Sequence, residues 1–252
     1  IDGDDQSAVV NHPLPKPLAV RLADAGGNAV VDYPITFTVG SDGSFGGKNT
    51  VTVKSDAGGN AAATYTLGKS AGRQKIAEAS AEWNDEAVGG SPAEFYATAA
   101  ADAAALAAIH AGDGQSAPVQ SVLPAPLVVK ITDVFGNPVG GFEVTFTVID
   151  GNGTLNGANR QSARTDGDGL ARVVWQLGPT AGVQRVRASC VGLTPSTLEF
   201  SATAAAGAPA QLVYIAGNGQ TGSPNAALAD SFVVRVADAF GNAVAGHEVQ
   251  FA

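Results

Sequence analysis

The sequence has 252 residues and carries 14 Lys and Arg against 23 Asp and Glu, a formal net charge of −9. This acidic balance, with the basic residues scattered, excludes a nucleic-acid partner, because phosphate binding needs clustered Lys and Arg. A single Cys cannot form an internal disulfide, and the length suffices for two or three domains that each bury a core.

Targeting and membrane signals are also missing from the sequence. No apolar run approaches the roughly 20 residues that a membrane span needs, so we expect no membrane insertion by this segment. No signal-peptide pattern opens the chain. The lack of any Met, including an initiator, predicts a processed chain or an excerpt from a longer one.

The first landmark in chain order is an apolar strand with a turn after it, and it occurs three times. It occupies residues 17–30, 126–139 and 231–244. The Asn residues near its end (Asn28, Asn137 and Asn242) are 109 and 105 residues apart. The period therefore predicts three domains: residues 1–101, residues 102–206, and the N-terminal part of a third in residues 207–252.

The three repeats have ragged ends. Repeat 1 lacks the first strand, which we expect near Leu106–Ile109 in repeat 2 and Gln211–Ile215 in repeat 3, and repeat 3 stops inside an expected strand at Gln250–Ala252. A window cut from a longer array is the simplest interpretation. The alternative is that the open repeat 1 accepts a strand from a neighbour, as exposed sheet edges do.

Within each repeat, apolar and polar residues alternate with the period of two that is typical of strands. Leu127, Val129 and Ile131 are expected on one face, and the segment Phe142–Val148 alternates in the same way. Further strands are expected at residues 35–39, 50–54, 62–67, 172–177, 184–189 and 198–203. With Gly-, Asn- and Asp-rich turns between them, the pattern predicts an all-β chain of tandem immunoglobulin-like β-sandwiches in an elongated array.

One local signal opposes this interpretation. The Ala-rich run Ala97–Ile109 favours a helix by propensity. Its counterpart Ala202–Ala210 contains Gly207 and Pro209, which a short helix there would not tolerate. We therefore predict that both runs are a last strand that continues through a short linker into the next repeat.

The motifs of repeat 2 resemble a known family. Asp133–Val139, Val144–Val148, Thr165–Ala171 and Thr180–Gly182 are similar to the bacterial Ig-like group 1 domain of invasins and intimins. The resemblance covers almost the whole chain, and Gly26 departs from it where the other repeats have Phe. It implies a repetitive extracellular stalk on the bacterial cell surface, whose receptor binding lies in modules outside this sequence.

Each repeat has an Asp before its Gly-Asn pair, and these residues are the candidate structural sites. An Asp side chain can accept backbone N–H groups two residues on and so fix a turn. We predict that role, rather than a ligand contact, for three Asp and Asn pairs: Asp24 and Asn28, Asp133 and Asn137, Asp238 and Asn242.

We expect no cofactor and no metal. The alternative is a calcium site at the module boundaries, made by Asp4, Asp5, Asp113 and Asn218. The strings Gly217–Gly222 and Asp166–Gly169 imitate a dinucleotide motif and a calcium loop, but neither has the context that its motif requires, and both are expected to be loops.

Catalytic signals are also weak, so we predict that the chain is not an enzyme. The three His residues (His12, His110 and His247) occupy non-equivalent places, and no nucleophile motif is present. Cys190 is expected to be a small buried residue. Trp83 and Tyr96 are expected in the core, with a sugar-binding platform as the alternative.

These observations predict a non-catalytic stalk of Ig-like domains in a bacterial surface or secreted adhesin. Its partners would be the neighbouring modules of the same chain. Two alternatives stay open: a subunit of an extracellular fibre whose copies are joined by strand complementation, and a module that binds a receptor or glycan.

Overall fold

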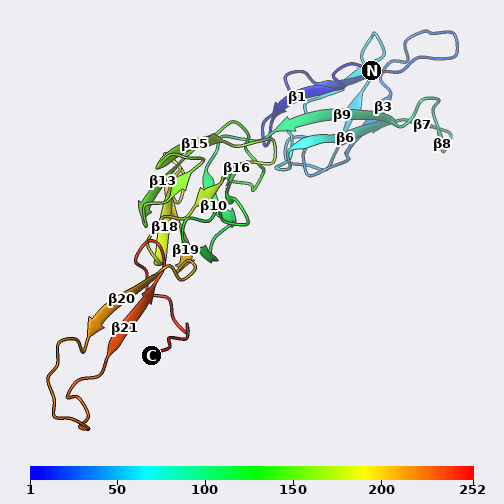
Figure 1. Cartoon of the computed structure of the whole chain (residues 1–252). Helices are drawn as coiled ribbons and strands as arrows, with labels where there is room; N and C mark the ends of the chain where they lie inside the picture. The colour runs from blue at the N-terminus through cyan, green and yellow to red at the C-terminus, as the bar shows by residue number, and fades with distance from the viewer. The chain divides into compact units, whose positions relative to one another are not determined.

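A computed structural model describes residues 1–252, and every regular element in it is a β-strand (Figure 1). The chain forms two compact units. Unit 1 comprises residues 1–104 together with Thr132–Val139, and unit 2 comprises residues 105–131 and 140–252. No segment is a helix with the length and apolar character to cross a membrane.

Unit 1 is a two-layered arrangement of β-strands. Its strands are β1 (Gln6–Val9), β2 (Leu18–Arg21), β3 (Pro34–Val39), β4 (Thr50–Lys54), β5 (Asn60–Ala63), β6 (Gly72–Ser80), β7 (Glu82–Trp83), β8 (Glu86–Ala87) and β9 (Ala93–Ala100). The larger sheet has the order β1-β9-β6-β3-β4, and β2 pairs with β5 in a second sheet. Strand β1 runs parallel to β9, with Gln6 opposite Ala97, while β7 and β8 form a separate hairpin.

Unit 2 repeats this arrangement. Its strands are β10 (Leu106–Ala111), β11 (Gln115–Pro118), β12 (Leu127–Thr132), β13 (Glu143–Asp150), β14 (Thr154–Leu155), β15 (Arg160–Arg164), β16 (Leu170–Val173), β17 (Trp175–Gln176), β18 (Gly182–Ser189), β19 (Thr197–Ala205), β20 (Gln211–Ala216) and β21 (Val233–Ala237). One sheet has the order β11-β19-β18-β13-β15 and the facing sheet the order β10-β12-β16. Strands β20 and β21 pair only with each other.

The core of each sandwich comes from the alternating apolar residues. Phe37 and Phe95 are fully buried in unit 1, and their counterparts Phe146 and Phe200 are fully buried in unit 2. The paired rings lie 6.3 Å apart between centroids in both units. Leu127, Val129 and Ile131 are also fully buried. The predicted inward face of this strand is confirmed, and each unit is a β-sandwich.

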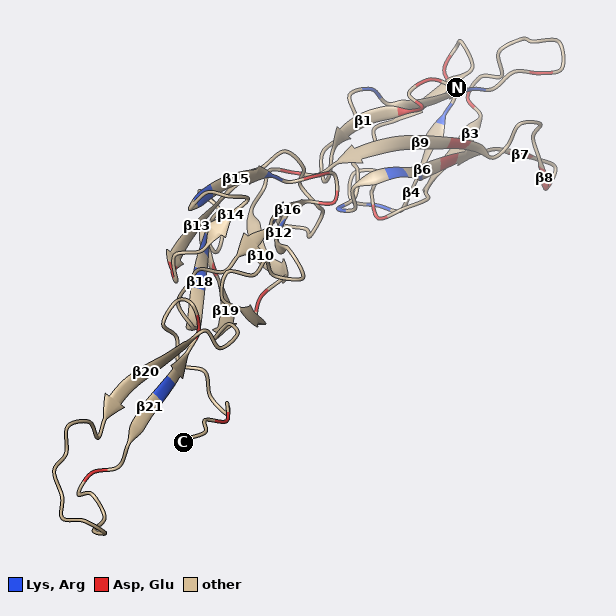
Figure 2. Ribbon diagram, viewed as in Figure 1, with Lys and Arg blue, Asp and Glu red and all other residues tan.

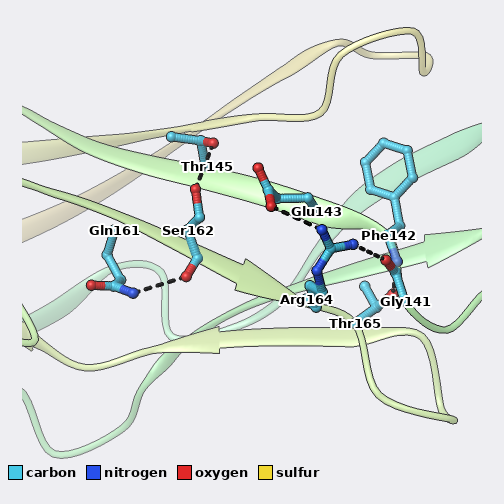
Figure 3. A network of polar contacts seen from close by, with 8 residues as sticks. All are labelled: Gly141, Phe142, Glu143, Thr145, Gln161, Ser162, Arg164 and Thr165. Atoms are coloured by element: carbon cyan, nitrogen blue, oxygen red, sulfur yellow. Dashed lines mark hydrogen bonds and ion pairs between the residues drawn. The ribbon is translucent and has the colours of Figure 1, made fainter.

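The outer face of β13 and β15 is held by polar cross-strand pairs, which Figure 3 shows. Arg164 opposes Glu143 in the register and lies 3.3 Å from its carboxylate. The same guanidinium donates a hydrogen bond to the carbonyl of Gly141 at 2.8 Å. Thr145 and Ser162, the next pair on this face, share a hydrogen bond of 3.1 Å. Such exposed pairs fix register more than they add stability.

The Ala-rich run is extended, as predicted. Strand β9 ends at Ala100 and β10 begins at Leu106, with no helix between them. Tertiary pairing overrides the helix propensity of Ala here, because β9 lies between β1 and β6 in the sheet.

Residues 250–252, however, form no strand. The prediction of a strand there was wrong, because the equivalent strands β3 and β13 each have a partner on both sides. Residues 248–252 have no such partners. Residues 207–252 fall within unit 2, so the division into three domains stays a prediction from the sequence.

Charged side chains are dispersed in both units. Figure 2 shows Lys and Arg on separate strands and loops, interspersed with Asp and Glu. The ion pairs, such as Lys54 with Asp32 at 3.0 Å, are solvent-exposed. Exposed pairs of this kind contribute about 0 to 1 kcal/mol each.

Candidate functional site

The three Asp-Asn turns have one geometry. In each, the Asp Oδ1 accepts hydrogen bonds from the backbone N–H groups two and four residues on. The distances are 2.9 and 2.8 Å for Asp24, 2.8 and 2.9 Å for Asp133, and 2.9 and 2.9 Å for Asp238. The carboxylate thereby takes up N–H groups that the tight turn leaves without a backbone acceptor.

The Asn that ends the second turn reaches a distant loop within unit 1. Asn137 Nδ2 donates to the carbonyl of Lys69 at 2.7 Å, and Asn137 Oδ1 accepts from the N–H of Ala71 at 2.9 Å. One amide side chain therefore satisfies a donor and an acceptor of the segment that leads into β6. This contact lies within unit 1, to which the end of β12 and the turn after it, Thr132–Val139, belong.

The same pair of hydrogen bonds occurs within unit 2. Asn242 Nδ2 donates to the carbonyl of Pro179 at 2.8 Å, and Asn242 Oδ1 accepts from the N–H of Ala181 at 2.9 Å. Asn28, the counterpart in repeat 1, bonds only to Asp24. In repeats 2 and 3, two hydrogen bonds thus hold the turn on a loop of the repeat before it. This loop is Leu67–Gly72 for Asn137 and Leu177–Gly182 for Asn242.

The second oxygen of the Asp carboxylate bonds the linker between repeats. Asp133 Oδ2 accepts from the N–H of Asp102 at 3.0 Å, and Asp238 Oδ2 accepts from the N–H of Gly207 at 2.8 Å. Asp133 is 0% exposed and Asp238 1% exposed. Asp24 bonds only within its own turn and is solvent-exposed. We define the inter-repeat anchor as this turn with its loop and linker contacts.

The electrostatics of the anchor favour the ionised carboxylate. Burial raises the pKa of Asp238, but hydrogen bonds from Asn242, Gly207 and Phe240 outweigh it and lower the pKa from 3.8 to about 2. Burial also raises the pKa of Asp133, and the hydrogen bonds from Asn137, Asp102 and Phe135 bring it below the ordinary value. Both carboxylates are therefore charged at neutral pH.

Apolar packing supports the first anchor. Phe135 is half-buried and packs against the hydrophobic core of unit 1. The ammonium group of Lys69 lies 5.6 Å from the centroid of its ring, within the range of a cation–π contact. The equivalent Phe240 of the second anchor is 54% exposed, so the two anchors share their polar contacts and differ in their packing.

The four residues of the calcium alternative each bond a neighbour within their own unit. Asp4 accepts a hydrogen bond from the N–H of Tyr96, and Asp5 pairs with Arg73 at 2.7 Å. Asp113 accepts from the N–H of Ser201, and Asn218 N–H bonds to the hydroxyl of Tyr214. No three His, Cys, Asp or Glu side chains gather where they could hold a metal ion. Calcium binding there stays an untested alternative to the expected absence of a metal.

The position of Trp83 differs from the one expected from the sequence. It is 63% exposed on β7, so its placement in the core was wrong. Strands β7 and β8 form a hairpin for which repeat 2 has no counterpart, and the ring of Tyr33 lies 6.0 Å from that of Trp83. Together with Val30 and Val88 they line a groove of about 540 Å³. Tyr96, also expected in the core, is only half-buried, with its hydroxyl donating to Glu94 at 3.0 Å and the Arg73 guanidinium 4.8 Å from its ring centroid, so this expectation was wrong too.

Two further residues from the sequence analysis, Cys190 and Asp166, lie in the core and in a turn, respectively. Cys190 is fully buried, as expected, and burial raises the pKa of its thiol. Asp166 accepts hydrogen bonds from the N–H groups of Asp168 and Leu170 in the turn between β15 and β16. Its carboxylate also pairs with Arg172, and this pair, with the hydrogen bonds, lowers the pKa of Asp166.

The partners of the anchor were not identified from the sequence. Lys69–Ala71 and Pro179–Ala181 belong to the repeated segments Leu67–Gly72 and Leu177–Gly182, which lie 110 residues apart, close to the 109 and 105 residues between successive Asp-Asn turns. That shared period was the available signal. Because the contacting atoms are backbone N–H and C=O groups, residue type gives no direct indication of which loop the Asn would reach.

These features define an all-β, Ig-like protein. Its recurring polar site is the inter-repeat anchor, which links one sequence repeat to the next. No protein-family model and no curated protein matches the chain. Among solved structures, it is similar to FdeC, an adhesin of Escherichia coli, with 18% identity and a TM-score of 0.57 over 97% of this chain and 74% of that one. It is also similar to InvD of Yersinia pseudotuberculosis, with 17% identity and a TM-score of 0.52 over 94% and 69%. The resemblance to bacterial Ig-like adhesin domains of the invasin and intimin type is confirmed for the fold.

Proposed function

We propose that the chain is a non-catalytic stalk segment of a bacterial adhesin, exposed at the cell surface or secreted. The observation that carries this proposal is the inter-repeat anchor, which recurs with the same donors and acceptors at Asn137 and Asn242. Each module bonds a loop of the repeat before it and carries the same loop for the repeat after it. An array of such modules grows in length in proportion to its copy number. The fold shared with FdeC and InvD supports the adhesin setting.

A display experiment tests the stalk. The chain is placed once, twice and three times between an outer-membrane anchor and a terminal epitope on bacteria. We expect antibody-coated beads to capture the cells through a surface polysaccharide layer only when enough copies are present to place the epitope beyond that layer. We also expect the chain itself to bind no host cell. Adhesion by a single copy without any terminal module would contradict the stalk role.

A second candidate function is binding of a receptor or glycan by repeat 1. The specific observation in its favour is the exposed Trp83 beside Tyr33 over the groove of about 540 Å³. Exposed aromatic rings are typical of binding platforms, and repeat 2 lacks the hairpin that carries this one. Glycan-array binding that is lost in Trp83→Ala and kept in Tyr96→Ala would favour it over the stalk.

A further inference from the structure

Strand β4 is an edge of the larger sheet in unit 1, because it pairs with β3 and with no other strand. Odd-numbered residues make the backbone hydrogen bonds of this pair. At its two ends, Asn49 accepts a hydrogen bond from Val39, and Ser55 donates one to Tyr33, both at 2.9 Å. Alternate residues of a strand point their N–H and C=O groups to the same side. The residues that present these groups to the open edge are therefore the exposed Thr50, Thr52 and Lys54.

The composition of β4 favours pairing with a further strand. Four of its five residues are Thr or Val, the β-branched types that suit strands. Its one charged residue is Lys54, and lysines on an edge strand oppose such pairing. The Lys54 ammonium, however, lies 3.0 Å from the carboxylate of Asp32, so its charge is balanced within the chain.

The equivalent edge in unit 2 has a different character. Strand β15 is also an edge strand and pairs with β13 as β4 pairs with β3. It has an arginine at each end, Arg160 and Arg164. Arg164 is paired with Glu143, whereas Arg160 forms no ion pair. Because an unbalanced charge on an edge strand opposes the addition of another strand, the edge open to pairing is the one in unit 1.

The edge of β4 is self-complementary in an antiparallel arrangement. Thr52 lies at the centre of the segment that is bonded to β3. A twofold axis at Thr52 places Thr50 opposite Lys54 of the second copy, so no like charges face each other. The same axis brings Lys48 beside Asp56 of the second copy, and both residues are exposed. Opposite charges therefore meet at both ends of the paired segment.

We propose that β4 is the contact strand of a twofold-symmetric pair of chains, in which the larger sheets of two copies of unit 1 join edge to edge. The two strands would share about six main-chain hydrogen bonds, because each facing pair of residues exchanges both of its N–H···O bonds. Such a short edge buries less surface than a standard protein interface, so the pair is a weak one. The inference concerns lateral contact between chains and is independent of the stalk proposal.

Sedimentation equilibrium of the full chain tests this pairing. We expect the dimer fraction to rise as the concentration increases from about 10 μM to about 1 mM, the range of a weak contact. Thr52→Pro removes an N–H that faces the open edge and no bond to β3, so the fold should tolerate it. It should raise the dissociation constant at least about tenfold. Ser162→Pro, the same change at the equivalent position of β15, should leave the dissociation constant unchanged.

A disulfide test reads the register. In antiparallel strands, residues of a hydrogen-bonded pair have Cα atoms about 5.5 Å apart, a spacing that a disulfide can bridge. Thr52→Cys should therefore give a covalent dimer under mild oxidation. Thr50→Cys should give at least about tenfold less, because its counterpart lies opposite Lys54 instead. The unaltered chain is the control, since its Cys190 is fully buried.

Hydrogen exchange locates the contact on the strand. The amides of Thr50, Thr52 and Lys54 should exchange more slowly as the protein concentration rises, because they gain acceptors in the second copy. The amides of Val51 and Val53 already face β3, so their exchange should not change with concentration. Slower exchange on β15 instead of β4 would overturn the proposal.

Thr52→Lys gives a second variant that does not depend on tolerance of a proline. It places two ammonium groups opposite each other, so it too should weaken the dimer, and Ser162→Lys is its matched control. A dimer that persists unchanged in Thr52→Lys would overturn the proposal. A chain that stays monomeric at about 1 mM, or equal crosslinking through Thr50→Cys and Thr52→Cys, would overturn it too. None of these results bears on the display test of the stalk.

Discussion

Asn137 and Ala71 are 66 residues apart in the sequence, yet Asn137 Oδ1 accepts a hydrogen bond from the N–H of Ala71 at 2.9 Å. Asn242 and Ala181 repeat this contact at the same distance. A local turn motif thus makes a long-range contact wherever a repeat precedes it. The acceptor loop is itself repeated, at Leu67–Gly72 and Leu177–Gly182.

The first prediction concerns the anchor's amide. Asn137→Ala removes the bonds to Lys69 and Ala71 and leaves backbone groups unsatisfied, so it should lower the free energy of unfolding by about 1 to 3 kcal/mol. Asn28→Ala is the matched control, because Asn28 has the turn contacts without the distant ones. Urea unfolding and hydrogen exchange at Ala71 measure both effects. Equal losses in the two variants would show that the distant bonds contribute nothing.

The second prediction concerns pH. The pKa of Asp238 is lowered from 3.8 to about 2, so its ionised form stabilises the folded chain above pH 4. This contribution is lost as the pH falls from about 4 to about 2. Acid unfolding should therefore be less steep in Asp238→Asn than in the unaltered chain. Because other carboxylates titrate in both proteins, the difference between their stability curves is the measured quantity. Parallel curves would contradict the assignment.

The third prediction compares a buried ring with an exposed one. Phe146 is fully buried in unit 2, and truncating it to Ala should cost about 3 to 5 kcal/mol of unfolding free energy. Phe240 is 54% exposed, and Phe240→Ala should cost less than about 1 kcal/mol. Thermal unfolding followed by hydrogen exchange should assign the loss in Phe146→Ala to unit 2. A similar loss for both variants would contradict the packing described.

The fourth prediction uses the two tryptophans. Trp83 is 63% exposed and Trp175 fully buried, so iodide should quench the emission of Trp83 and leave that of Trp175. Trp83→Phe should remove the quenchable component and change the unfolding free energy by no more than about 0.5 kcal/mol. Loss of the unquenched component in this variant would place Trp83 in the core instead.

Much of the fold was predictable because period-two patterns state which residues face inward. The alternation in Leu127–Thr132 placed that strand correctly, and comparison of Ala97–Ile109 with its Gly- and Pro-containing counterpart corrected a misleading helix signal. Trp83 was misplaced because an aromatic in a sandwich is usually core, whereas this one lies on an inserted hairpin. The acceptors of Asn137 and Asn242 are backbone atoms, which no residue pattern identifies.

The central proposal is that the chain is a run of Ig-like modules that acts as a stalk. Pulling single molecules of a tandem fusion of the chain tests it most directly. Each complete module has about 100 residues, so each unfolding event should release about 30 to 35 nm of contour length, with events in proportion to copy number. Extension without reproducible steps of that size would contradict the claim.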